Sequence, residues 1–161
     1  MTPIYNRRIE ELYLKMYNRL FIFADNALKN PALAEEAVQE TFRIACMKPE
    51  SLCNSPNPEG WLVNTMKNVI CNIRRERASM DRVLSAYIFS KAKELSASED
   101  QLDFSLLYQN IAGMEEYKLL KEMVLDGKSH LEMAKARGIS VEACKKRVQR
   151  AKEKLKKKIL D

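Results

Sequence analysis

The chain is poor in the residues that interrupt helices. It contains only 4 glycines and 5 prolines among its 161 residues. Glycine and proline are the least favourable residues in a helix interior, so their scarcity leaves room for long helices. Charged residues make up 31% of the chain, which is typical of a folded protein with a solvated surface. We therefore expect an all-α protein.

The chain also lacks the groups from which most catalytic and metal sites are built. It has one histidine, His130, and four cysteines at Cys46, Cys53, Cys71 and Cys144. No two cysteines have the C-x-x-C spacing of a zinc site, and there is no glycine-rich phosphate loop. We expect a protein that is not an enzyme, holds no metal and needs no cofactor, with its thiols reduced.

Long apolar runs are absent as well. No stretch approaches the ~18 apolar residues of a membrane span. The first eight residues, Met1 to Arg8, are not followed by the apolar core of a signal peptide. We expect no membrane partner and a cytoplasmic location.

Positive charge is concentrated at the C-terminus. Residues 140–161 hold nine lysines and arginines against three acidic residues, which accounts for the whole net charge of +6. A basic excess confined to one terminal segment indicates a polyanionic partner, either nucleic acid or an anionic membrane surface.

Three predicted helices start with a capping residue followed by proline, at Thr2-Pro3, Asn30-Pro31 and Asn57-Pro58. Apolar residues then recur at steps of three and four, as on one face of a helix. These residues are Ile9, Leu12, Tyr13, Met16, Leu20, Phe23 and Ala27 in the first helix, Ala34, Ala37, Val38, Thr41, Phe42 and Ala45 in the second, and Leu62, Met66, Val69, Ile70 and Ile73 in the third. The three helices predict an N-terminal domain of residues 1–78.

The segments between the helices differ in composition. Residues 49–58 contain a turn-rich stretch and predict a loop. Residues 79–101 end in a polar run and predict a linker, although part of this segment could form a loose helix. Helical patterning resumes in residues 102–161, which we predict to be a second small domain.

A helix-turn-helix is predicted from Ser129 onward. Ser129 and Glu132 fit a capping box, in which each side chain accepts a hydrogen bond from the backbone of the other residue. Gly138 supplies a left-handed residue that ends a short helix, and Ser140 can cap the next helix. Two helices joined by so short a turn are typical of this motif. The expected inward residues of the first helix are Leu131 and Ala134.

The second helix of the motif has two distinct faces. Its expected inward residues are Ala143, Cys144, Val148, Ala151 and Leu155. The residues that point away from them are Lys145, Lys146, Gln149, Arg150 and Glu153. Arginine, glutamine and lysine are side chains that hydrogen-bond to base edges and phosphates, so this face predicts DNA binding. The lysines from 152 to 158 are explained equally well as a solvated basic surface.

Residues 127–155 resemble region 4 of the extracytoplasmic-function sigma factors of bacterial RNA polymerase. The matching letters are G-K-S-H-L-E-M-A and then G-I-S-V-E-A-C-K-K-R-V-Q-R-A-K-E-K-L. The resemblance implies a domain that reads the duplex minus-thirty-five element, and His130 is open to a packing role instead. The implied contacts are Ser129, His130, Lys145, Lys146, Arg147, Gln149 and Arg150. Glu142, Ala143 and Cys144 stand where the family has Gly-Thr-Val, which leaves the preferred promoter sequence open.

The N-terminal half resembles region 2 of the same family. Residues 36–42, E-A-V-Q-E-T-F, are similar to D-L-V-Q-E-T-F, which implies docking on the polymerase clamp through Glu36, Gln39 and Glu40. Residues 61–68, W-L-V-N-T-M-K-N, followed by Arg74 and Arg75, are similar to W-L-x-x-I-A-R-N and the basic residues after it. The implied contacts with the single-stranded minus-ten element are Trp61, Asn64, Lys67, Asn68, Arg74 and Arg75. Trp61 is equally well explained as a core anchor.

The resemblance therefore implies a sigma factor with two helical domains and a linker. Its partners would be core RNA polymerase and promoter DNA, with an anti-sigma factor as a further partner that the family allows. One alternative is a one-component helix-turn-helix regulator that binds its operator without polymerase. The other is a helical adaptor that uses the basic tail to bind an acidic partner or a membrane surface.

Overall fold

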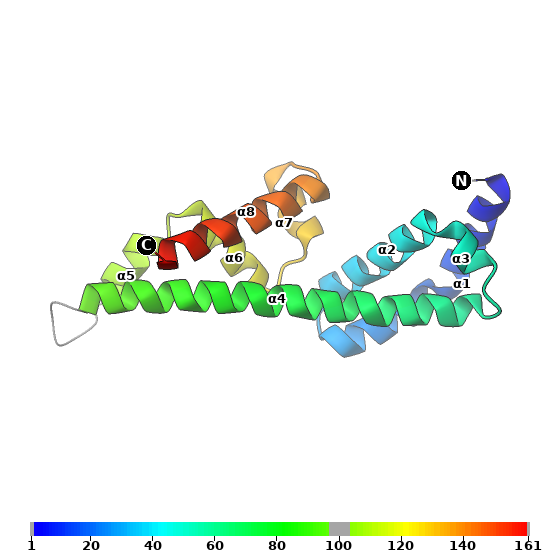
Figure 1. Cartoon of the computed structure of the whole chain (residues 1–161), viewed down its shortest axis with the longest axis horizontal. Coiled ribbons are helices and arrows are strands. Elements are labelled where there is room, and N and C mark those ends of the chain that lie inside the picture. Colours follow the sequence, from blue (N-terminus) through cyan, green and yellow to red (C-terminus); the bar gives the residue numbers. More distant parts are fainter. Residues whose placement is uncertain (1, 97–103, 161) are drawn as a thin grey trace. The chain divides into compact units, whose positions relative to one another are not determined.

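The computed structural model of the chain describes residues 2–96 and 104–160, and Figure 1 shows that their regular structure is entirely helical. The helices are α1 (Pro3–Leu28), α2 (Pro31–Met47), α3 (Pro49–Cys53), α4 (Pro58–Ser96), α5 (Phe104–Ile111), α6 (Glu115–Val124), α7 (His130–Arg137) and α8 (Val141–Leu160). No strand occurs in these described ranges, which confirms the prediction of an all-α protein at this level.

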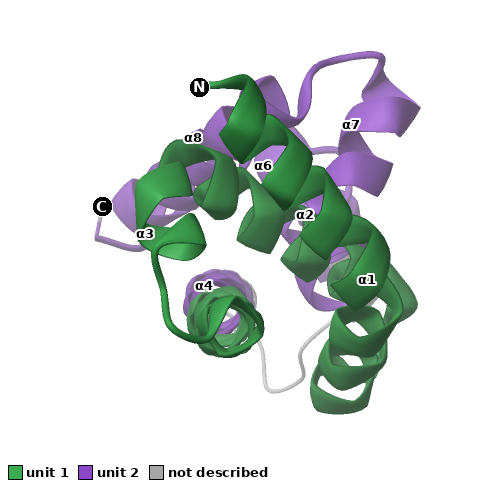
Figure 2. Cartoon of the chain, turned by 90° about the vertical axis from the view of Figure 1, so that its right-hand side faces the viewer, with its two compact units in different colours: residues 1–75 green, residues 76–161 purple. Residues whose placement is uncertain are grey.

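The chain divides into two compact units, which Figure 2 shows in different colours. Unit 1 is Met1–Arg75 and unit 2 is Glu76–Asp161. The division falls inside α4, so the first half of this helix belongs to unit 1 and the second half to unit 2. Each unit has its own hydrophobic core.

The predicted helix starts of unit 1 are confirmed. Thr2 Oγ1 accepts a hydrogen bond from the Tyr5 N–H at 3.4 Å, at the start of α1. Asn30 Oδ1 accepts from the N–H groups of Ala32 and Leu33 at 3.0 and 3.2 Å, at the start of α2. Each cap satisfies backbone donors that a helix leaves without an internal partner.

The core of unit 1 is formed by the predicted apolar faces of α1, α2 and α4, with one correction. All the apolar positions predicted for α2, and all those predicted for α4, are buried. In α1, however, Phe23 is 40% exposed and Ala24 is buried instead. Because a helix has 3.6 residues per turn, its buried face moves gradually along the sequence, and here four-residue steps from Leu12 to Ala24 follow it.

Residues 49–58, predicted as a loop, contain the short helix α3. Leu52 is completely buried in the core of unit 1, so this segment is anchored at its centre. The Trp61 Nε1–H group donates to Ser51 Oγ at 3.1 Å and ties α3 to the start of α4. Asn57 Oδ1 accepts from the Gly60 N–H at 3.0 Å and caps α4.

The segment 79–101, predicted as a linker, differs in its described part. Residues 79–96 continue α4, and Met80, Val83, Leu84 and Tyr87 are buried in the core of unit 2. The sequence contains neither glycine nor proline between Gly60 and Gly113, so nothing in it stops the helix near residue 78. Residues 97–101 of the predicted linker, with 102 and 103, lie outside the described residues.

The core of unit 2 is assembled from α4 to α8. The second half of α4 contributes the four residues named above, and α5 contributes Leu107 and Ile111. The other buried members are Tyr117, Leu119, Leu120, Met123, Met133, Ala134, Cys144, Val148, Ala151 and Leu155. In α7 the inward residues are therefore Met133 and Ala134, and the predicted Leu131 is half-buried. The helix-turn-helix is thus packed on α4 as well as on α6.

Candidate nucleic-acid interface

The local geometry of the helix-turn-helix confirms its predicted caps and turn. Ser129 Oγ accepts from the Glu132 N–H at 3.2 Å, and Glu132 Oε1 accepts from the Ser129 N–H at 3.4 Å. Gly138 has a φ of 65°, the left-handed conformation that favours glycine, and ends α7. Ser140 Oγ then accepts from the Ala143 N–H at 3.1 Å and caps α8. These contacts fix where α8 begins relative to α7.

The faces of α8 separate largely as predicted. Cys144, Val148, Ala151 and Leu155 are buried, and Ala143 is half-buried. On the opposite face Lys146, Arg147, Gln149 and Arg150 are exposed, and Lys145 is half-buried. An exposed helix face with this set of donors has the chemistry required to contact base edges and phosphates in a major groove. We call residues 145–150 of this face the basic face of α8.

Ser129 and His130 require a correction. Both were predicted to contact DNA, and both are 2% exposed. The Ser129 hydroxyl is used in the capping box, and His130 Nε2 lies 3.0 Å from Glu76 Oε1. Side chains this deeply buried cannot reach a phosphate or a base in this conformation. The structure therefore does not place them with the basic face of α8.

Glu76 was not singled out from the sequence. Burial raises the pKa of its carboxyl group, and the hydrogen bond with His130 lowers it. The charges of Arg77 and Lys145 act in the same direction, so the pKa of Glu76 lies below its ordinary value. Glu76 thus remains a carboxylate at neutral pH and links α4 to the first residue of α7.

Arg77 forms a second link from α4 to the motif. Its Nη1 donates to the carbonyl oxygen of Met123 at 2.6 Å, and its Nη2 donates to the carbonyl oxygen of Lys128 at 2.8 Å. Met123 lies in the last turn of α6, and Lys128 precedes the capping residue of α7. One guanidinium group therefore satisfies two backbone acceptors at a helix end and a turn, where helical partners are missing. Arg77 orients the turn that leads into the helix-turn-helix.

A partly buried ionic cluster centred on Glu122 holds α6 to the motif. Arg137 Nη2 and Lys128 Nζ donate to the two oxygens of the Glu122 carboxylate, the latter at 3.2 Å. Burial raises the pKa of Glu122, but the hydrogen bonds and charges of Arg137 and Lys128 together lower it below its ordinary value. Arg137 and Lys128 are therefore paired within unit 2.

In unit 1, the predicted minus-ten residues on α4 have three different environments. Asn64, Lys67, Asn68 and Arg75 are exposed. Trp61 is half-buried against the core of unit 1, so its packing role is real. Arg74 Nη2 donates to the carbonyl oxygen of Ala27 at 2.6 Å, in the last turn of α1. Arg74 is exposed as well, so all these residues except the half-buried Trp61 are accessible for contact with nucleic acid, although Arg74 also forms a structural bond.

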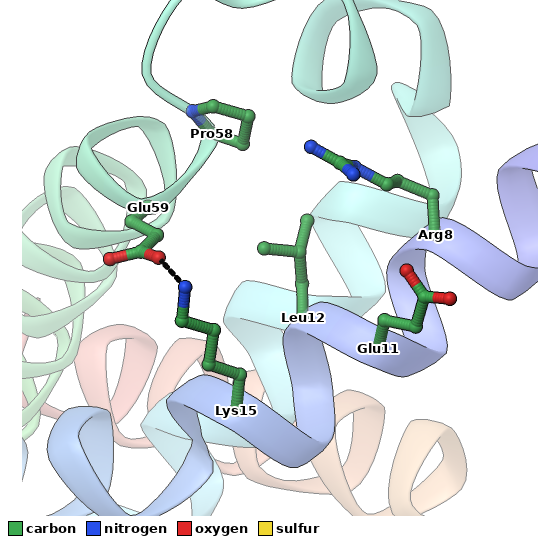
Figure 3. Close-up of a pocket in the computed structure, with 6 residues that line it drawn as sticks. All are labelled: Arg8, Glu11, Leu12, Lys15, Pro58 and Glu59. Carbon is green, nitrogen blue, oxygen red and sulfur yellow. Dashed lines mark ion pairs between the residues drawn. The ribbon is translucent and has the colours of Figure 1, made fainter.

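A cleft of about 230 Å³ lies between α1 and the start of α4 (Figure 3). Its lining residues are Arg8, Glu11, Leu12, Lys15, Pro58 and Glu59. Lys15 forms an ion pair with Glu59, and the hydrogen bond from Lys15 lowers the pKa of the Glu59 carboxyl group. None of the predicted minus-ten residues lines this cleft.

The predicted docking residues lie on one stretch of α2. Gln39 is exposed, and Glu36 and Glu40 are half-buried. The Glu40 carboxylate accepts two hydrogen bonds from Arg43, at 2.7 and 2.8 Å. Arg43 also lies 2.9 Å from Met47 Sδ. Sequence reasoning missed Arg43, although its position three residues after Glu40 is a spacing at which opposite charges meet on a helix.

Comparisons with known proteins were made against family models, curated proteins and solved structures. None of the three finds a match to this chain. Among the described residues, no helix is both long enough and apolar enough to cross a membrane.

Proposed function

We propose that the chain is a sigma factor that directs bacterial RNA polymerase to its promoters from a cytoplasmic location. The observation that carries the proposal is the capped helix-turn-helix of unit 2, with the exposed basic face of α8. A helix of this kind fits the major groove, and its lysines and arginines neutralise phosphates. This supports duplex DNA as the partner of unit 2.

Unit 1 supports the same proposal through a second surface. Asn64, Asn68 and Arg75 recur at helical spacing on α4 and are exposed, so amides and a cation share one side of this helix. Single-stranded nucleic acid is bound by cations for its phosphates and by polar or aromatic groups for its bases. The resemblance to sigma region 2 assigns this side of α4 to the minus-ten element.

Docking on polymerase rests on the resemblance and on the surface of α2. Glu36, Gln39 and Glu40 belong to the matching segment, and Gln39 is exposed. The Glu40–Arg43 pair holds one carboxylate in a fixed geometry, which lowers the entropic cost of using it in an interface. A one-component regulator would have no need for this second surface.

The experiment that tests the proposal is copurification of the full chain with core RNA polymerase, followed by transcription from a promoter library. The proposal requires a stable complex and transcription that depends on the added chain. Tight and specific binding to an operator by the isolated chain, without a complex with polymerase, would favour the one-component regulator instead.

A further inference from the structure

Glu142 lies on the same face of α8 as the predicted DNA contacts. Residues three, four, seven and eight positions further along the helix share its side, and these are Lys145, Lys146, Gln149 and Arg150. The Glu142 side chain is 74% exposed. Glu142 therefore lies next to the basic face of α8, one turn closer to the start of the helix, and carries the opposite charge.

A carboxylate is unexpected at this place. Glu142 is the only acidic residue in the sequence between positions 141 and 152, where five lysines and arginines occur. Near DNA phosphates a carboxylate is repelled, so it weakens binding unless a hydrogen-bond donor lies opposite it. A carboxylate in the first turn also stabilises a helix through its dipole. If Glu142 has only that role, replacing it changes the stability of the chain and leaves its base preference unchanged.

The position of Glu142 in the motif indicates which donor lies opposite. In a helix-turn-helix the first residues of the second helix contact base edges in the major groove. The donors in that groove are the amino groups of cytosine and adenine. Adenine presents an acceptor beside its amino group and is matched by an amide, whereas a carboxylate only accepts and is matched by cytosine.

We propose that Glu142 is a specificity-determining residue that accepts a hydrogen bond from the N4 amino group of a cytosine in duplex DNA. The inference rests on the proposed function, since it requires α8 to enter a major groove. Lys145 Nζ lies 4.0 Å from Glu142 Oε1, so a cation on the next turn offsets the repulsion between this carboxylate and nearby phosphates. Glu142 would then contact the base, and the lysines would bind the phosphates.

The test is selection from a randomised duplex DNA library, with the full chain alone and in the presence of core polymerase. The variants are Glu142→Gln and the matched control Glu115→Gln, which changes an exposed glutamate in the first turn of α6, away from the basic face of α8. The native chain should select a motif in which one position prefers cytosine about tenfold or more. In Glu142→Gln that single preference should relax or change to adenine, while Glu115→Gln keeps the native motif.

Thermal melting of each variant separates the two roles of Glu142. A motif unchanged in Glu142→Gln, with or without a lower melting temperature, would overturn the assignment and leave DNA binding intact. If the native chain enriches no motif under either condition, both this inference and the proposed function fail.

Discussion

His130 Nε2 lies 3.0 Å from Glu76 Oε1, so the first helix of the helix-turn-helix is bonded to α4. Arg77, the next residue of α4, donates to two backbone carbonyls at the entry to the motif. The helix-turn-helix, which carries the proposed DNA-binding surface, is therefore held in place by the part of α4 that belongs to unit 2. This dependence has consequences for stability and for any attempt to isolate the motif.

Replacing His130 with alanine should destabilise unit 2 by about 2–4 kcal/mol. The change removes a fully buried side chain and takes a hydrogen-bond partner from the Glu76 carboxylate. Urea unfolding of the full chain, followed by circular dichroism, measures this loss. Gln149→Ala, on the exposed face of α8, is the control and should change stability by less than about 0.5 kcal/mol. Equal stability of the two variants would show that the His130–Glu76 contact is not structural.

Lowering the pH should destabilise unit 2, because the carboxylates of Glu76 and Glu122 become protonated. Both carboxyl groups have a pKa below the ordinary value of 4.5 in the folded chain. A lowered folded-state pKa contributes stability that is complete above the unfolded-state pKa and is lost as the pH falls through the folded-state pKa. The free energy of unfolding should therefore decrease below a pH of about 4.5.

The variant Glu122→Gln provides the control for this pH dependence. It should be less stable than the native chain at neutral pH, because Arg137 and Lys128 lose their charged partner. It should also lose less stability than the native chain between pH values of about 5 and 3. Parallel pH profiles for the two proteins would mean that Glu122 does not contribute to acid unfolding.

The fragments 76–161 and 102–161 should differ in folding. The longer fragment retains Met80, Val83, Leu84 and Tyr87, which belong to the core of unit 2. The shorter one lacks them and would expose the apolar surface that they cover, at roughly 1.5–3 kcal/mol for each large buried side chain. Amide hydrogen exchange should show cooperative protection in the longer fragment alone. Equal protection in both would mean that the second half of α4 is dispensable.

The sequence predicted the local features well, because these are set by residues close together in the chain. The caps at Thr2 and Asn30 and the turn at Gly138 follow from side chains acting on nearby backbone groups. The partner of His130 is 54 residues away and could not be read from local patterns. The continuation of α4 beyond residue 78 could have been predicted, because the apolar spacing continues there without a glycine or proline.

The same difference between local features and long-range contacts applies to the candidate site. Face assignments on α8 were predictable because helical periodicity determines which residues share a side. The burial of Ser129 and His130 was not, because it depends on α4 packing against the motif. The resemblance to a family names contacts but contains no information on such packing in this chain.

Replacing Gln39 and Glu40 together with alanine should weaken binding to core polymerase by about tenfold or more. The fold should be kept, because Gln39 is exposed and the Glu40–Arg43 pair lies on the helix surface. Copurification and a binding titration measure the effect. Glu50→Ala, an exposed acidic residue of α3, is the charge-matched control. If both variants bind polymerase like the native chain, the docking surface lies elsewhere.

Transcription by core polymerase on a library of genomic fragments, compared with and without the full chain, tests the proposed sigma-factor function. Discrete start sites should appear only when the chain is added, and a shared sequence should precede them at the distance of the minus-thirty-five element. Glu142→Gln and the native chain should favour different bases at one position of that sequence. A transcript pattern that is identical with and without the chain would rule out this function.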